Sequence, residues 1–395
     1  MPKILLVTQN FYPEIGSAAN RMKNLFLHLK ANGYDVHVFT TEPSYPNRNM
    51  YKNKKYYYDE TINALEGTKI TRISMRHEKH KHSMTSRIYH YTEFMLKVHY
   101  FVRKTSHLFD YIYVSSPNIF TAWGTLFFQK TNTQRILEIR DLWPDSVVAL
   151  DTMNIKPVLP MLVQLERQMY NNADKIVVNN TAFIPHIKQM LSANKPMLYL
   201  PNAINSKENQ LPAQSSSFSV VYSGNVGLAQ NIDQLIEIAE RLNEAQITFN
   251  AIIYGVNANQ FKAYVKERQL KYVNVFDPMP RQECLQLMAK SHIALSILKD
   301  TDVFLNVMPG KVIDAICSNV LIVTNLGGDT NQLINEEQIG YARESATTDE
   351  LMTAILEYKH NRQLYQEHRN NTIKIKNRDF IWEKNIHKLI NFIEA

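Results

Sequence analysis

The chain has 395 residues, of which 45% are hydrophobic and 21% are charged, and its formal net charge is +7. This composition is typical of a soluble globular protein of two or three domains, and no apolar run is long enough to span a bilayer. The first residues lack the long apolar core of a signal peptide, and the 2 cysteines are too few for a disulfide framework, so we expect a cytosolic protein. The positive charge favours anionic partners: nucleic acid, acidic lipid or phosphorylated metabolites.

The first half of the chain alternates predicted strands and helices, which indicates a parallel α/β sheet. A strand at 4–8 is followed by a loop that ends at Gly16, a helix at 17–32 and a strand at 35–41. The glycine fingerprint of dinucleotide enzymes is absent from the first turn, which argues against an NAD-dependent dehydrogenase. Further strands are expected at 69–74, 111–115, 135–139 and 175–178, and helices at 86–104, 119–130, 157–172 and 181–192.

Three segments of this half are rich in basic and aromatic residues. The long loop 42–67 contains several lysines and tyrosines, and a loop of that length is usually functional or mobile. The run 76–82 has three histidines, which we interpret as a solvated basic loop rather than a metal site. The helix at 86–104 is either a core helix with charged edges or a surface that lies on anionic lipid headgroups, and we favour the lipid interpretation.

Polar residues follow the strand at 135–139 in the sequence RDLWPDS, residues 140–146. Parallel sheets bind their ligands just past the carboxyl ends of their strands. Arg140 is therefore a candidate for binding an anion, and Asp141 and Asp145 are candidates for hydrogen bonding to a sugar or for taking a proton. The alternative is a salt-bridged cap in which Asp145 begins the next helix.

Residues 206–217 are polar, contain three consecutive serines and show no periodicity, so they are expected to mark a domain boundary. The second half begins again with a strand at 218–222 and a glycine loop at 223–231. Gly224 and Gly227 let the backbone approach a phosphate or a sugar closely, although without a lysine the loop is not a P-loop. Further strands are expected at 249–254, 273–276, 293–297 and 320–324, and helices at 232–243, 260–269, 281–290, 348–360 and around Trp382.

The segment 303–329 is expected to bind an anion. Pro309 is a plausible first residue of a helix, and Gly327-Gly328 a turn that approaches a ligand. A helix N-terminus offers free N–H groups and partial positive charge, and Lys311 adds a full charge there. Asp314 lies three residues later on the same face, where it could accept hydrogen bonds from a diol next to the phosphate. The alternative is an ordinary surface Lys–Asp pair.

In their order and spacing these motifs resemble glycosyltransferase family 4, whose members have the GT-B fold of two Rossmann-like domains facing across a cleft. A subgroup of bacterial surface-polysaccharide transferases, the N-acetyl-L-fucosaminyl transferases of O-antigen assembly, is similar in IRDLWPDSV. The likeness spans nearly the whole chain and is carried by KILLVTQNFYPEIGSAANR (3–21), IRDLWPDSV (139–147), the helix with Glu166 and Arg167 that leads into ADKIVVNN (173–180), LPNAIN (200–205), YSGNVGLAQN (222–231), PGKVIDAICSNVLIVTNLGGD (309–329) and FIW (380–382).

The resemblance implies transfer of a sugar from a nucleotide sugar, in our expectation a UDP-sugar, with retention of configuration and without a metal or other cofactor. Accordingly, Asp300 and Asp302 are interpreted as surface acids. The donor would lie mainly on the C-terminal domain. Two glutamates of the family pattern fall at Asn306 and Asp314, and the family's catalytic histidine falls at about Asp141.

We predict an N-terminal domain of residues 1–204 joined by the last helix, 378–395, and a C-terminal domain of residues 205–377. The expected catalytic residues are Asp141, Lys311 and Asp314. The expected donor site consists of Gly224, Asn225, Gly227, Tyr254, Gly255, Met279, Asn306, Pro309, Gly310, Lys311, Asp314, Gly327 and Gly328. The expected acceptor side consists of Gly16, Arg21, Arg140 and Asp145.

The expected partners are a UDP-sugar donor, a lipid-linked sugar or polysaccharide acceptor and an anionic membrane surface. A membrane-presented acceptor favours a peripheral position on the cytoplasmic face of the cell membrane, attached through the basic and aromatic segments 48–58 and 76–104. Nucleic acid is not expected, because no recognised binding module is present. Two alternatives remain open, a non-catalytic binder of nucleotide sugars on the same fold and a nucleotide-sugar epimerase.

Overall fold

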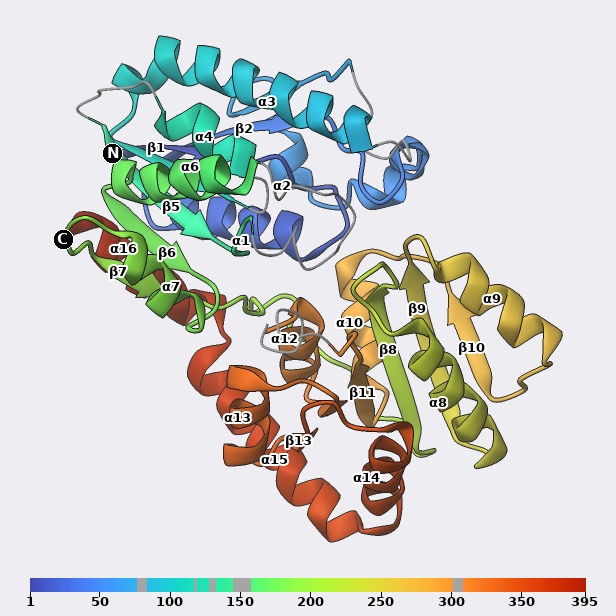
Figure 1. The fold of residues 1–395 in the computed structure, drawn as a ribbon. Helices are drawn as coiled ribbons and strands as arrows, with labels where there is room; N and C mark the ends of the chain where they lie inside the picture. The colour runs from blue at the N-terminus through green and yellow to red at the C-terminus, as the bar shows by residue number, and fades with distance from the viewer. Residues whose placement is uncertain (77–83, 117–118, 128–132, 145–157, 301–307) are drawn as a thin grey trace. The chain divides into compact units, whose positions relative to one another are not determined.

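The computed structural model describes the chain except for residues 77–83, 117–118, 128–132, 145–157 and 301–307 (Figure 1). The chain divides into two compact units. Met1–Pro201 and Glu383–Ala395 form the first unit, and Asn202–Trp382 forms the second. Within the described ranges, no helix is both long enough and apolar enough to cross a bilayer.

The first unit is built on a seven-stranded sheet with the order β3-β2-β1-β4-β5-β6-β7, and every neighbouring pair is parallel. Four residues of an inner strand, Ile4 to Val7, are completely buried, as expected for a strand covered on both faces. The strands are β1 (Lys3–Val7), β2 (Asp35–Thr41), β3 (Ile70–Ile73), β4 (Tyr111–Ser115), β5 (Gln134–Ile139), β6 (Lys175–Val178) and β7 (Met197–Tyr199).

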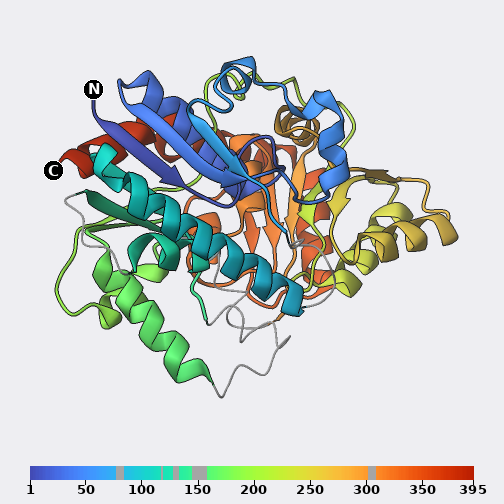
Figure 2. The ribbon, with the colours of Figure 1, turned by 90° about the horizontal axis from the view of Figure 1, so that it is seen from above.

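Helices cover this sheet, and the longest of them, α3, packs Phe94, Val98 and Val102 into the core (teal in Figure 2). The segment 42–67, expected to be a loop, contains short helical turns. The helices of the first unit are α1 (Ser17–Ala31), η1 (Arg48–Lys52), η2 (Lys54–Tyr56), α2 (Glu60–Asn63), α3 (Met84–Thr105), η3 (Ser106–Leu108), α4 (Ile119–Leu126), α6 (Leu159–Asn172), α7 (Phe183–Met190) and α16 (Trp382–Glu394), whose first residue belongs to the second unit.

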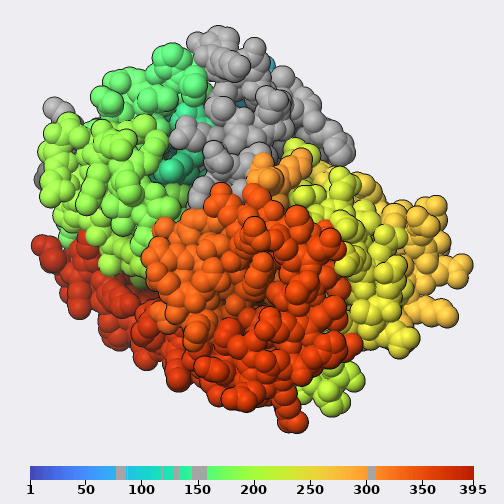
Figure 3. All heavy atoms as spheres, turned by 60° about the horizontal axis from the view of Figure 1, so that its bottom comes forward, coloured from blue at the N-terminus to red at the C-terminus, as the bar shows by residue number. Residues whose placement is uncertain are grey.

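The second unit has a six-stranded parallel sheet with the order β10-β9-β8-β11-β12-β13. Its strands are β8 (Ser219–Asn225), β9 (Thr248–Tyr254), β10 (Val273–Phe276), β11 (Ile293–Ser296), β12 (Leu321–Thr324) and β13 (Gly340–Ala342). Its helices are α8 (Ile232–Glu244), α9 (Ala258–Glu267), α10 (Arg281–Ala289), α12 (Gly310–Cys317), α13 (Gly328–Glu336), α14 (Thr348–His360) and α15 (Arg362–Asp379). In Figure 3 the orange surface of its later residues lies beside the yellow surface of its earlier ones.

The two sheets confirm the predicted α/β class with two Rossmann-like domains, and three local predictions need correction. Pro309 is the N-cap of α12 rather than its first residue. Gly328 begins α13 instead of forming a free turn. The helix α15 was not predicted, because its sequence is almost entirely polar and its buried residues are few.

The two chain segments that connect the units are held together by backbone hydrogen bonds. The Ile204 N–H donates to the Phe380 carbonyl at 3.0 Å, and the Trp382 N–H donates to the Ile204 carbonyl at 3.0 Å. The side chain of Trp382 is 1% exposed. The return of the chain to the first unit is therefore anchored at a buried aromatic residue.

A lysine from β6 caps the last helix of the first unit. Lys175 Nζ donates to the carbonyl oxygens of Phe392 at 2.7 Å and Ile393 at 2.8 Å, and the lysine is 6% exposed. Carbonyls in the last turn of a helix have no partner inside the helix. The positive charge of the lysine also interacts favourably with the negative end of the helix dipole.

Replacing this cap should loosen α16. In Lys175→Met, the two carbonyls lose their donor, which should destabilise the helix by about 2 kcal/mol and speed hydrogen exchange of residues 383–395 by about thirtyfold. Hydrogen-exchange mass spectrometry measures this, with Lys388→Met on the exposed side of the same helix as the control. Equal exchange in the two variants would mean that Lys175 is not the cap that holds the helix.

Candidate functional site

In each sheet the strand order reverses beside the first strand of the unit, between β1 and β4 and between β8 and β11. Open parallel sheets bind ligands outside the carboxyl ends of the strands at such a reversal. Ligand-binding residues are therefore expected in the segments that follow β1 and β5 in the first unit, and β8 and β11 in the second.

In the second unit, a chain of polar contacts links the start of α12 to the end of β8. Lys311 Nζ donates to the hydroxyl of Tyr222 at 2.7 Å and lies 4.2 Å from the centre of that ring. The Tyr222 hydroxyl in turn donates to the Asn225 carbonyl at 2.9 Å. Lys311 is thereby fixed beside the glycine loop, and a Cβ atom at Gly224 would lie 3.8 Å from its Cε atom.

Burial sets the protonation of this lysine. It lowers the pKa of Lys311 from 10.5 to about 7, because an ammonium group is poorly solvated there and its hydroxyl partner carries no charge. The amine is consequently close to half-protonated at neutral pH. An anion bound beside it would restore the charge, so the position suits a phosphate group.

The glycine loop has no room for side chains. Gly224 has φ +133° and Gly255 has φ +109°, conformations that other residues rarely adopt. A Cβ at Gly255 would lie 2.0 Å from Asn225 Oδ1, and one at Gly227 would lie 2.6 Å from Asn225 Nδ2. The loop is closed by the Val226 N–H, which donates to the Tyr254 carbonyl at 2.7 Å. The sequence thus brings four predicted donor residues, Gly224, Asn225, Gly227 and Gly255, into contact.

Asp314 pairs with an arginine that the sequence did not single out. Arg281 Nη1 lies 2.8 Å from Asp314 Oδ1, and Arg281 Nε lies 3.5 Å from Glu208 Oε1. Burial alone would lower the pKa of Arg281, but the two carboxylates outweigh it and raise the pKa. The alternative interpretation of an ordinary surface Lys–Asp pair is not what the side chains form, because Lys311 contacts Tyr222 and Asp314 contacts Arg281.

The remaining predicted donor residues lie around this centre or outside the described part of the chain. Gly327 is packed so closely that a Cβ there would lie 2.3 Å from Glu344 Oε2. Met279 is partly buried against the core cluster that contains Val312. Asp300 accepts a hydrogen bond from the Ser345 hydroxyl at 2.6 Å. Asn306 and Asp302 fall outside the described residues.

In the first unit, a fully buried carboxylate organises the ends of β4 and β5. Glu138 accepts hydrogen bonds from Arg21 Nε at 2.7 Å, Tyr113 Oη at 2.5 Å and Ser115 Oγ at 2.7 Å. Burial would raise the pKa of Glu138, but Arg21 and Arg140 lower it below its usual value. Arg21, which is 1% exposed, was predicted to contact the acceptor, and its position makes it a residue that holds Glu138 instead.

Arg140 brings a second guanidinium to the same carboxylate. Its Nη2 lies 3.4 Å from the Ser17 hydroxyl, and its Nε and Nη1 atoms are buried with no hydrogen-bond partner among the described residues. Burial lowers its pKa to about 10, so it is charged at neutral pH. Two arginines and one glutamate leave this cluster with an excess positive charge, one of the features expected where an anion binds.

The other predicted residues of the acceptor side flank this cluster. Gly16, with φ +136°, is the N-cap of α1 and precedes Ser17. Asp141 is exposed directly after Arg140, and its carboxylate counteracts the lowering of the pKa of Arg140. Asp145 falls outside the described residues.

Sequence reasoning missed Tyr222, Arg281, Glu208 and Glu138. Tyr222 and Glu138 lie in predicted strands, where alternation reveals the buried face but not a polar contact. Glu208 lies in a segment interpreted as a linker, and Arg281 at the start of an ordinary helix. The sequence offered one signal for these contacts, which is that Glu138 is a charged residue inside a predicted buried strand.

Comparison with known proteins agrees with these features. Residues 204–376 match the family described as "Glycosyl transferases group 1". The chain is 22% identical over 351 residues to the "Putative colanic acid biosynthesis glycosyl transferase WcaI" of Escherichia coli strain K12, a match that covers 84% of this chain and 85% of the relative.

Solved structures share the fold at low sequence identity. A sucrose-phosphate synthase from Thermosynechococcus elongatus is 14% identical, with a TM-score of 0.74 over 100% of this chain and 98% of that one. Anabaena Alr3699/HepE, solved with UDP and glucose, is 14% identical, with a TM-score of 0.67 over 100% of both chains. The predicted GT-B fold is confirmed. Residues 204–376 match the group 1 glycosyl transferase family, and this match and the E. coli relative together support the resemblance to family 4 and a glycosyltransferase.

Proposed function

We propose that this protein transfers a sugar from a UDP-sugar to a lipid-linked or polysaccharide acceptor in the synthesis of a bacterial cell-surface polysaccharide such as a capsule or O-antigen. The transfer would retain the anomeric configuration and would need no metal. The observation that carries the proposal is Lys311, held beside the Gly224 loop at the N-terminus of α12. The E. coli relative is named for colanic acid biosynthesis, and the HepE structure contains UDP and glucose, which supports the choice of product and donor.

The chemistry needs a group that offsets the charge of the leaving nucleotide. The acceptor hydroxyl oxygen forms a bond to the anomeric carbon, the bond from that carbon to the β-phosphate oxygen breaks, and the hydroxyl proton is released. Negative charge therefore builds on the diphosphate. Protonated Lys311 and the N–H groups at the start of α12 would stabilise it, and such electrostatic stabilisation is usually the largest catalytic effect.

The acceptor would meet the carboxyl edge of the sheet in the first unit. Arg140 supplies positive charge there, which suits the phosphate groups of a lipid-linked acceptor. Asp141 is exposed beside it and could bind a sugar hydroxyl or take its proton. Asp314, oriented by Arg281, would bind a diol of the donor.

A transfer assay with a panel of UDP-sugars and a lipid-linked acceptor tests this function, and Lys311→Ala tests its centre. If Lys311 is the main cation at the leaving diphosphate, its removal should lower kcat by about a hundredfold or more. Lys262→Ala, an exposed lysine of the same unit, is the matched control. Near-normal turnover in Lys311→Ala would remove the lysine from the mechanism.

The same assay decides between the alternatives left open by the sequence. Binding of nucleotide sugars without turnover on any acceptor would indicate a non-catalytic binder. A changed sugar nucleotide in the absence of acceptor would indicate an epimerase. The non-catalytic binder is considered because Asn306 stands where the family pattern has a glutamate.

The depressed pKa of Lys311 gives a pH dependence to UDP binding. The lysine is charged below pH 7 and loses its proton above it, so the free protein must take up a proton to bind the diphosphate at higher pH. The affinity for UDP should fall by up to about fiftyfold between pH 7 and pH 9, where the diphosphate itself is already ionised. Isothermal titration calorimetry measures the affinity and the proton uptake.

Lys311→Arg is the control for this titration, because an arginine keeps its charge throughout that range. Its UDP affinity should not depend on pH between 7 and 9. A wild-type affinity that is equally flat would show that Lys311 does not titrate on binding.

We also propose that the protein attaches peripherally to an anionic membrane through the first unit. Exposed apolar residues lie on α3, with Tyr89 63%, Leu96 59% and Tyr100 69% exposed, and exposed basic residues follow at Arg103 and Lys104. Apolar and aromatic residues at the interface, flanked by cations, are typical of membrane-surface helices. A membrane position would present a lipid-linked acceptor to the enzyme.

Flotation with vesicles of phosphatidylcholine and phosphatidylglycerol tests the attachment. The wild-type protein should float with the vesicles at low salt, and less of it should do so as salt is raised. Changing Lys54, Lys55, Arg103 and Lys104 together to Glu should abolish flotation, since each cation contributes about 1 kcal/mol near an anionic surface. A wild-type protein that stays with the soluble fraction at low salt would rule the attachment out.

A further inference from the structure

Two grooves of the first unit adjoin at one residue, Arg72, which lines both of them. Each has a volume of about 640 Å³, within the range of sites that hold small-molecule ligands. One is apolar and the other polar. Neither contains any of the residues that we assign to the donor or to the Arg140 cluster.

The apolar groove lies between the edge strand β3 and the helix α3. Its floor is continuous with the core, because Phe39 is 2% exposed and stacks on Phe101 with ring centres 4.2 Å apart. Its outer wall is formed by Leu96 and Tyr100, which are 59% and 69% exposed. The lining residues are Phe39, Thr71, Arg72, Ile73, Ser74, Leu96, Lys97, Tyr100 and Phe101. An apolar chain laid here would cover side chains that water otherwise contacts.

The polar groove lies where β2 ends, on the carboxyl side of the sheet. Its carboxylates are matched by arginines: Glu42 Oε2 lies 2.6 Å from Arg48 Nη2, and Glu66 Oε1 lies 2.7 Å from Arg72 Nη2. Tyr51 and Tyr57 add aromatic surface. Balanced ion pairs offer both donors and acceptors without a strong net charge, which suits a neutral polyhydroxy ligand such as a sugar better than an anion.

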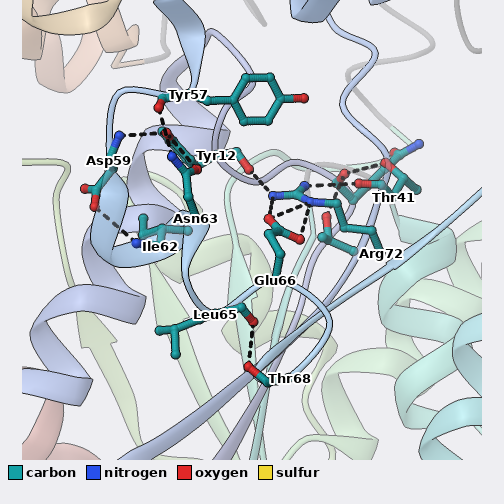
Figure 4. A network of polar contacts seen from close by, with 12 residues as sticks. Tyr12, Thr41, Tyr57, Asp59, Ile62, Asn63, Leu65, Glu66, Thr68 and Arg72 are labelled. Carbon is teal, nitrogen blue, oxygen red and sulfur yellow. Dashed lines mark hydrogen bonds and ion pairs between the residues drawn. The ribbon is translucent and has the colours of Figure 1, made fainter. Parts of the chain in front are cut away.

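Arg72 holds the two grooves in a fixed relation (Figure 4). Its Nε donates to Glu66 Oε1 at 2.9 Å and Oε2 at 3.0 Å, and its Nη2 donates to the Tyr12 carbonyl at 2.5 Å. Its Nη1 lies 3.4 Å from the Thr41 carbonyl. Figure 4 also shows Tyr57, which lines the polar groove together with Arg72 and Glu66.

We propose that the two grooves together bind an amphiphilic saccharide, with the hydrocarbon chain in the apolar groove and the sugars in the polar groove. In a glycosyltransferase of the proposed function this ligand is the lipid-linked acceptor, and to that extent the inference rests on the proposed function. A protein partner would not require an apolar and a polar groove joined end to end.

Binding of n-dodecyl-β-maltoside below its critical micelle concentration tests the proposal without any need for turnover. This probe has a neutral disaccharide head and an apolar chain. It should bind to the full-length protein at least about tenfold more tightly than maltose, because even a few buried methylene groups contribute that much. It should also bind more tightly than dodecyldimethylamine oxide, which has the chain but no sugar.

Variants separate the two grooves. Leu96→Glu should weaken binding of the maltoside by about tenfold and leave maltose unaffected, because it places a charge in the apolar groove. Tyr57→Ala and Glu42→Gln should each weaken the binding of maltose. Met161→Glu, at an apolar residue 58% exposed on α6, is the matched control for Leu96.

Several results would overturn the proposal. They are a maltoside affinity no greater than that of maltose, an amine oxide that binds as well as the maltoside, and equal losses in Leu96→Glu and Met161→Glu. Failure of the proposed function is distinguishable from these. A protein that binds the maltoside as expected but transfers no sugar from any UDP-sugar would keep the grooves and lose the transferase activity.

Discussion

The structure of the second unit depends on one constraint, a partly buried lysine amine that has no carboxylate partner among the described residues. Within the part of the chain that the structure describes, Lys311 contacts the hydroxyl and the ring of Tyr222 and no carboxylate, so its charge is unfavourable in the absence of an anion. The protein tolerates this by letting the amine lose its proton near neutral pH. An anion that binds beside the amine would restore this charge.

The glycine loop follows from the same constraint. Lys311 can be fixed beside the backbone because Tyr222 passes the contact on to the carbonyl of Asn225, and because the Asn225 side chain occupies the space that a Cβ at Gly255 would need. The two hydrogen bonds of Tyr222 and the glycine at position 255 therefore act as one assembly. A substitution at Gly255 should disturb the lysine without touching it, since cores and tight turns transmit displacements.

The sequence was most informative where the constraint is local. Strands buried on both faces, the glycines of the 223–231 loop and the lysine at a helix start are all visible as short patterns. Contacts between distant segments were not: Arg281 is 33 positions from Asp314, and the carboxylate of Glu138 collects partners from α1 and β4. Asp314 was expected on the helix that carries Lys311 and lies on α12, but its ion pair with Arg281 was not predicted, because a helix pattern shows which residues share a face and not what packs against it.

Each unit holds a partly buried cation, a lysine in the second unit and an arginine in the first. The difference between these cations explains the residues that surround each of them. A lysine can become neutral, so Lys311 needs no buried carboxylate when its site is empty. An arginine keeps its charge at any ordinary pH, even though burial lowers the pKa of Arg140 to about 10. The first unit accordingly buries Glu138 beside it, with Arg21, Tyr113 and Ser115 satisfying that carboxylate. The first unit therefore carries a permanent positive centre, and the second carries one whose charge depends on pH.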